Sequence, residues 1–238
     1  MIQPTAPAMP EGATNGPIPP LRDGDRLTRA EFERRYEAMP HVKKAELING
    51  VVHMPSPVRH GHHSRPNIKL GWWLVEYELV TPGVEAGYNG TNRVDLENEP
   101  QPDSYLLIDP ARGGRTRISA DDYVEGGPEL VGEVTGGRTD FVLGEKLRVY
   151  ERCGVQEYIV WRMRDRALDW FVSRDGQFQP LPAGPDGIFC SVVFPGLWLD
   201  AAALVRGDLA RVKAVLYQGV ATPEHAAFVK KLNPPAKS

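Results

Sequence analysis

The chain has 238 residues, of which 41% are hydrophobic, so it can bury the core of one main domain, and its net charge of −3 gives no overall attraction to nucleic acid. Its two cysteines, Cys153 and Cys190, are too few for a disulfide framework and lack the spacing of a zinc site, which predicts a protein of the reducing cytoplasm. No segment has the roughly 18 uninterrupted apolar residues that a membrane helix needs, so we expect no membrane span.

The composition divides the chain into three parts. Residues 1–24 are rich in proline and glycine and lack the basic and apolar segments of a secretory signal, which predicts a disordered arm. Residues 25–200 alternate between helical and strand patterns and predict an α/β (α+β) domain with a mixed central sheet flanked by helices. Residues 201–238 carry a helical pattern, weakened by Gly207, and predict a C-terminal helical extension.

The first ordered elements that we expect are a helix and a hairpin. A capping box at Thr28 opens a helix that runs to about Ala38. The dipeptide Asn49-Gly50 between two apolar runs then predicts a tight turn between two strands, and Glu46 lies on the first of these strands.

A second helix is predicted over residues 66–80. Its residues Ile68, Trp72, Val75 and Leu79 recur at the spacing of one helix face, so we expect this apolar stripe to face the core.

Two later strands carry acidic residues. Asp103 lies at the entrance of an apolar strand over 104–108, and Glu133 lies within another over 130–134. Because apolar residues fall on both faces of the second strand, it should be covered on both sides, where a carboxylate needs either a neutralising cation or a solvated strand end.

A helix follows this strand after a Gly-Gly turn. We expect it to be capped near Thr139 or Asp140 and to end at Gly154. Lys146 lies beside the apolar stripe of this helix and can therefore face Glu133.

These residues together resemble the Uma-family restriction endonucleases, a branch of the PD-(D/E)xK nuclease superfamily. The motifs that carry the resemblance are ELINGVV, Pro102-Asp103 before an apolar strand, GGPELVGEVT, RTD followed by EK, a tyrosine and CGVQEYIVW. They extend over roughly residues 28–200, and the most specific run is 127–161. The resemblance implies a restriction-endonuclease-like domain with an N-terminal helix and hairpin.

The resemblance also implies a metal-dependent phosphodiesterase site. Asp103 and Glu133, with the backbone carbonyl of Val134, are the expected ligands of one or two Mg²⁺ ions, with Mn²⁺ as an alternative, because hard oxygen ligands suit these cations. Lys146 matches the catalytic lysine of this branch, and Glu46 matches an early glutamate that would bind metal or orient water.

Two positions depart from the family patterns. The superfamily lysine usually lies two residues after the glutamate, where this chain has Thr135, and a Gly-Gly pair replaces the more common Ser-Pro. Asp140 matches a family aspartate, which we expect to be a helix cap.

Each site residue also has an ordinary structural interpretation. Asp103 can be a turn residue after Pro102, Lys146 a solvated helix residue and Glu46 a surface charge beside the hairpin. The sequence HGHH at 60–63 suggests a transition-metal site, although a polar loop is favoured because no Cys or Glu partner has convincing spacing.

The leading hypothesis is a Mg²⁺-dependent DNA endonuclease, for which a homodimer is plausible because cutting two strands needs two centres or sequential nicking. The main alternative, favoured by the mildly acidic charge, is a catalytically inactive binding or scaffold protein with the nuclease fold. A third hypothesis is a metalloenzyme that uses the histidine loop on a small substrate. The candidates for a local basic patch are Arg59, Arg65, Lys69, Arg112, Arg115 and Arg117; the alternative is that most of them are solvated charges, and members of such a patch would contact phosphates without reading the sequence.

Overall fold

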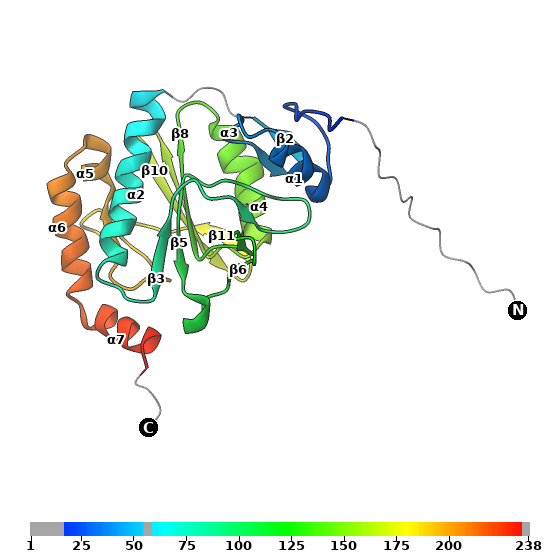
Figure 1. The fold of residues 1–238 in the computed structure, drawn as a ribbon. Coiled ribbons are helices and arrows are strands. Elements are labelled where there is room, and N and C mark those ends of the chain that lie inside the picture. Colours follow the sequence, from blue (N-terminus) through cyan, green and yellow to red (C-terminus); the bar gives the residue numbers. More distant parts are fainter. Residues whose placement is uncertain (1–16, 55–58, 235–238) are drawn as a thin grey trace, which may run out of the picture.

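The computed structural model describes residues 17–54 and 59–234, and at its centre is a six-stranded mixed sheet (Figure 1). Strand β8 pairs in parallel with β9 and antiparallel with β5, so the strand that carries Glu133 is hydrogen-bonded on both sides. In spatial order the strands are β11 (Gln177–Pro180), β10 (Ala167–Arg174), β9 (Glu157–Arg162), β8 (Leu130–Thr135), β5 (Ser104–Ile108) and β3 (Val84–Gly87).

Helices cover both faces of this sheet, as the apolar residues on both faces of β8 predicted. All six residues of β8 are buried; Leu130 and Val134 belong to one core, and Val131 belongs to a second core on the other face. The first face is covered by α2 (Arg65–Glu78), α5 (Ala201–Arg206), α6 (Leu209–Val220) and α7 (Pro223–Leu232). The second is covered by α3 (Thr139–Phe141), the π-helix η3 (Val142–Lys146) and α4 (Leu147–Arg152). The α/β (α+β) fold class is therefore confirmed.

The N-terminal helix and hairpin are confirmed as well. Helix α1 (Arg29–Glu37) is capped by Thr28, whose side chain accepts the backbone N–H of Glu31. Strands β1 (Glu46–Ile48) and β2 (Val51–His53) pair across a turn in which Asn49 and Gly50 have φ of 52° and 70°. These left-handed conformations define a type I′ turn, which glycine and asparagine tolerate best.

The packed structure begins before residue 25. Leu21 is buried with Phe32 and Leu47, and the backbone N–H of Gly24 donates to the carbonyl of Val52. The prediction of an arm over 1–24 is therefore wrong for 21–24, because the N-terminal core covers an apolar side chain there. Residues 1–16 of that arm lie outside the described residues.

The predicted helix α2 forms, but the prediction of its buried face is wrong. Ile68, Val75 and Leu79 are 59%, 43% and 71% exposed, and Trp72 is half-buried. A second apolar stripe packs on the sheet instead, and it consists of Leu70, Trp73, Leu74 and Tyr77. The helix carries two apolar stripes, and only the docked position of the helix distinguishes them.

The C-terminal region is helical, as expected, but it is divided. Gly207 adopts φ 82° and ends α5, after which the side chain of Asp208 caps α6. None of the helices in the described part of the chain is long and apolar enough to cross a membrane. The remaining elements are η1, a π-helix (His60–Ser64), η2, a 3₁₀ helix (Pro110–Arg112), β4 (Asn92–Arg93), β6 (Arg117–Ile118), β7 (Val124–Glu125), β12 (Ile188–Cys190) and β13 (Trp198–Asp200).

Candidate active site

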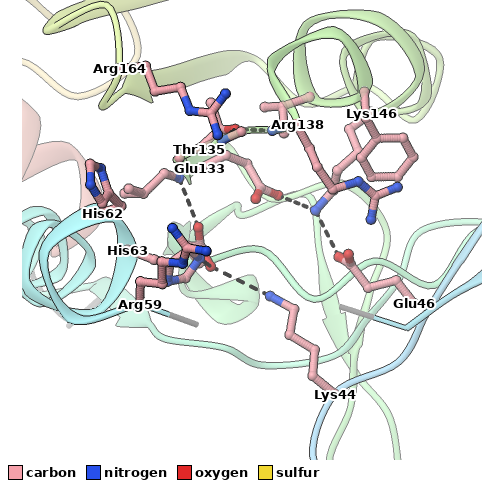
Figure 2. A pocket seen from close by; sticks show the side chains of 16 residues that line it. Lys44, Glu46, Arg59, His62, His63, Glu133, Thr135, Arg138, Lys146 and Arg164 are labelled. Carbon is pink, nitrogen blue, oxygen red and sulfur yellow. Dashed lines mark hydrogen bonds and ion pairs between the residues drawn. The ribbon is translucent and has the colours of Figure 1, made fainter. Parts of the chain in front are cut away.

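A pocket of about 440 Å³ lies where β1, β8, the turn η1 and the turn η3 meet (Figure 2). All of the side chains that the sequence singled out for catalysis line it, although they come from four separate segments. The lining includes Glu46, Asp103, Glu133, Val134 and Lys146.

Lys146 points inward and lies between two carboxylates (Figure 2). Its Nζ is 2.5 Å from Glu133 Oε1 and 2.8 Å from Glu46 Oε1, and the side chain is only 2% exposed. Burial opposes ionisation, but the two carboxylates outweigh it and raise the pKa of Lys146 above its usual value. The interpretation as a solvated helix residue is therefore wrong, and Lys146 stays positively charged.

Among the acids that line the pocket, Glu133 is the one whose ionisation burial opposes most clearly. Burial raises the pKa of Glu133 to about 7, although Lys146 acts in the opposite direction. The hydroxyl of Tyr150 also donates to Glu133 Oε1 at 2.9 Å. Glu133 is thus not a solvated strand end, and its charge depends on the cation beside it.

For Glu46, unlike Glu133, the neighbouring lysines outweigh the effect of burial on the pKa. It is buried, which alone would raise its pKa, but Lys146 and Lys44 lower that pKa below its usual value. The backbone N–H of Gln101 donates to Glu46 Oε1 at 2.8 Å and helps to hold the carboxylate in place. The interpretation of Glu46 as a surface charge is wrong.

Asp103 is 1% exposed, and only one of its two carboxylate oxygens is held by a hydrogen bond. Its Oδ2 accepts the backbone N–H of Val134 at 2.8 Å. Its Oδ1 has no hydrogen bond but lies 3.3 Å from His63 Nε2 and 3.5 Å from Lys44 Nζ. Burial raises the pKa of Asp103, but His63 and Lys44 outweigh this and lower it below its usual value.

Two other buried acids, Glu129 and Glu157, differ from Asp103 in this respect, whereas buried Glu99 also has an oxygen without a hydrogen bond but does not line the pocket. Both carboxylate oxygens of Glu129 accept backbone N–H groups, from Ile108 and Arg115. Both oxygens of Glu157 also accept hydrogen bonds, from the loop that follows β12. Because buried polar atoms are normally bonded, a buried carboxylate oxygen that faces a pocket without a hydrogen bond indicates a ligand position.

Three side chains that contact the predicted acids were not assigned to this site from the sequence, namely Lys44, His63 and Tyr150, although His63 belongs to HGHH and Tyr150 to the family motif. Lys44 had a detectable signal, because it lies two residues before Glu46 and residues at that spacing share a face of an extended chain. His63 and Lys146 both lie on π-helical turns, which are rare and are often found at functional sites.

Cations also line the outer part of the pocket (Figure 2). Arg138 and Arg164 are exposed, and no carboxylate in the described part of the chain forms an ion pair with either of them. Gly136 and Gly137 allow the turn after β8 to lie close to His62 and Arg164. A Cβ at Gly136 would lie 3.0 Å from the carbonyl oxygen of His62, and one at Gly137 would lie 3.2 Å from Arg164 Nη2.

Thr135, at the position of the usual superfamily lysine, has a structural role. Its Oγ1 accepts the backbone N–H groups of Gly137 and Arg138, at 3.4 and 3.1 Å, and thereby closes the Gly-Gly turn. The predicted cap at Thr139 or Asp140 is wrong, since Arg138 holds the N-cap position without a side-chain bond.

The basic residues proposed to contact phosphates do not form one patch. Of the six, only Arg59 lines the pocket. Arg112 donates to the carbonyl of Leu232, Arg115 donates to that of Gly154, and Arg117 forms an ion pair with Glu125.

The oxygen atoms of Asp103, Glu133 and Val134 are ligands that suit a hard divalent cation, although lysines already contact both carboxylates. Within residues 17–54 and 59–234, no three His, Cys, Asp or Glu side chains are grouped as a metal site. This holds for the HGHH sequence as well, so the histidine-loop centre gains no support. Asp103 Oδ1 is nevertheless a buried hard oxygen that faces the pocket with Glu133 and is contacted there, among the described residues, only by the cationic side chains of His63 and Lys44, and such oxygens fit Mg²⁺ or Mn²⁺.

The fold and the pocket define a protein of the restriction-endonuclease-like class. The chain matches the model of the Uma2 family, described as "Putative restriction endonuclease", over residues 29–202, and it belongs to that family. A crystal structure of a putative nuclease belonging to DUF820 from Anabaena variabilis is similar, with a TM-score of 0.52 and 11% identity over 72% of this chain and 97% of that chain. This likeness concerns the fold alone. None of the curated proteins matches the chain.

Proposed function

We propose that this protein is a metal-dependent endonuclease that hydrolyses phosphodiester bonds in DNA. The observation that carries the proposal is the convergence of Asp103, Glu133, Glu46 and Lys146 on one pocket, with Lys146 buried between two of the acids. Isolated buried charges are unfavourable, so their concentration in one pocket is typical of a functional site.

Asp103, Glu133 and the backbone carbonyl of Val134 would hold the ion in this proposal. Bound Mg²⁺ would supply a Lewis acid and favour the ionisation of a water molecule. The pKa of Glu133 is raised to about 7, whereas those of Asp103 and Glu46 are lowered, so the ionisation of Glu133 depends most on a nearby positive charge.

Lys146 supplies a fixed positive charge. Because Glu133 and Glu46 keep it protonated, it can stabilise negative charge on the phosphate as that charge develops. Glu46 positions Lys146, since its own carboxylate is held by the backbone of Gln101. Glu46 is therefore proposed as an accessory acid.

The outer cations are proposed to bind the DNA backbone. Arg59, Arg138 and Arg164 are exposed around the pocket, and guanidinium groups bind phosphate oxygens well. Such contacts position the nucleic acid without reading its bases. They also explain how a chain with a net charge of −3 could bind DNA, because the attraction would be local.

Cleavage of a supercoiled plasmid tests the proposal. We expect nicking with Mg²⁺ or Mn²⁺ by the wild type and a loss of at least about 100-fold in rate for Glu133→Gln and Asp103→Asn. Glu145→Gln is the matched control, because Glu145 lies on the same π-turn as Lys146 but is exposed and does not line the pocket. Equal nicking by wild type and Glu133→Gln would refute the assignment.

One observation favours the alternative of a catalytically inactive binding protein with the nuclease fold. Lys146 already pairs with both Glu133 and Glu46, so part of the negative charge of the pocket is compensated without any ion. Mn²⁺ binding, measured by electron paramagnetic resonance, separates the two candidates. The nuclease proposal expects binding that is lost in Asp103→Asn, whereas the inactive protein would not bind Mn²⁺.

A further inference from the structure

The outer face of α2 is an apolar surface that has no counterpart in the mechanism. Ile68, Val75 and Leu79 are 59%, 43% and 71% exposed, and half-buried Trp72 lies on the same face. We call these four residues the outer stripe. Tyr88 and Tyr217, which are 49% and 41% exposed, add apolar surface in neighbouring elements. Soluble monomers seldom expose a continuous apolar surface of this kind without a partner.

The spacing of the outer stripe favours another helix as its partner. Its residues follow one another at intervals of four, three and four, which is the spacing of the a and d positions in a coiled-coil seam. Ile68, Val75 and Leu79 lie opposite the face that packs on the sheet, and Trp72 also packs partly against that core, so a second helix would cover the exposed side of the stripe without displacing core contacts. Figure 1 shows that α5 and α6 lie beside α2, and Ile68, Val75 and Leu79 remain exposed next to them.

The charges beside the stripe favour a second copy of the same helix in the antiparallel direction. The N-terminal half of α2 carries Arg65 and Lys69, and the C-terminal half carries Glu76 and Glu78. Lys69 forms no ion pair within the described residues; its pKa is lowered by partial burial and by Arg65. An antiparallel copy would bring the acidic end of one helix next to the basic end of the other.

We infer that the protein forms a symmetric homodimer through the outer stripe of α2, with the two α2 helices antiparallel. In this arrangement Ile68 packs against Leu79 of the second copy, and Trp72 packs against Val75 of the second copy. Lys69 approaches Glu76 of the second copy at the edge of the seam and adds a second cation to that carboxylate, which already pairs with Lys213 of its own chain at 3.1 Å. The interface is isologous, so each stripe covers the other and the assembly closes as a dimer.

Sedimentation velocity at tens of micromolar protein tests the interface. We expect a dimer for the wild type and a monomer for Leu79→Lys, because the charge would be buried against an apolar seam. Leu96→Lys is the matched control: Leu96 is 76% exposed and lies away from α2, so this variant should stay dimeric. A monomeric wild type, or a dimer that Leu79→Lys leaves intact, would overturn the inference.

Disulfide trapping tests the direction of the helices. In a Cys190→Ser background, which removes the exposed native cysteine, Ile68→Cys and Leu79→Cys proteins are mixed and oxidised. Antiparallel pairing predicts a cross-link between the two variants and none within Ile68→Cys alone, where the two cysteines would be about 16 Å apart along the helix axis. Efficient cross-linking of Ile68→Cys with itself would exclude this arrangement. Neither assay depends on cleavage, so the result is independent of the proposed nuclease activity.

Discussion

Replacing Lys146 by methionine should destabilise the protein strongly. The substitution removes the cation that contacts Glu133 at 2.5 Å and Glu46 at 2.8 Å, and it leaves two buried carboxylates without it. Removing one partner of a buried ion pair typically costs about 3–5 kcal/mol, whereas an exposed pair contributes about 1 kcal/mol or less. We therefore expect a loss of about 3–5 kcal/mol in the free energy of unfolding at pH 8.

The loss should depend on pH in a defined direction. Burial already raises the pKa of Glu133 to about 7, and without Lys146 it should rise further. An acid whose pKa is raised by folding is protonated and tolerated at low pH, and it destabilises the folded state as the pH rises through the folded pKa. The effect of Lys146→Met should therefore be small at pH 5 and large at pH 8.

Urea unfolding in EDTA, followed by circular dichroism at both pH values, measures this effect without bound metal. Lys213→Met is the matched control, because Lys213 forms a 3.1 Å ion pair with Glu76 but is 50% exposed. A second variant, Lys146→Met with Glu133→Gln, should recover part of the stability at pH 8. If Lys146→Met loses no more than Lys213→Met, the buried charge cluster does not have the energetic role assigned here.

Three other perturbations test separate parts of the structure. Burial, with Glu33 as the next cause, raises the pKa of Glu99 from 4.5 to about 8. The wild type should therefore lose stability as the pH rises from 5 to 9. In thermal unfolding, Glu99→Gln should remove roughly 4 kcal/mol of that loss. Gly114→Ala should destabilise by about 2 kcal/mol or more in urea, since its Cβ would lie 1.8 Å from a backbone oxygen of Ile108, whereas Gly61→Ala has open space. Replacing both Arg138 and Arg164 by alanine should weaken binding of uncut DNA in EDTA and reduce the slope of log K against log salt by about 2, and an unchanged slope would contradict their role as phosphate contacts.

Helix α2 shows what periodicity can and cannot predict. Its amphipathic pattern identified the helix, but two apolar stripes satisfied the same spacing and the wrong one was assigned to the core. In the structure Trp73 and Tyr77 face inward, and their polar atoms donate to the carbonyls of Trp198 and Pro195. Those acceptors lie more than a hundred residues away in the sequence, so no local pattern could identify the buried face.

The candidate site was predictable to a different extent for each residue. Asp103 and Glu133 stand out as acids at apolar strands, and their motifs supplied the functional interpretation. The positions of Lys44 and His63 beside Asp103 depend on how the N-terminal hairpin and the turn η1 dock on the sheet. The same docking separates Arg59, at the pocket, from Arg117, which pairs with Glu125 elsewhere.

The sequence by itself determined the local elements, because hydrophobic period, capping residues and turn dipeptides act over a few residues. It also determined which residue types could hold a hard cation, since that depends on side-chain chemistry. Only the tertiary structure decided which face of α2 is buried and which charges meet. Burial then sets the balance between desolvation and ion pairing, and that balance fixes the charges of Lys146 and Glu133, which form an ion pair in the pocket.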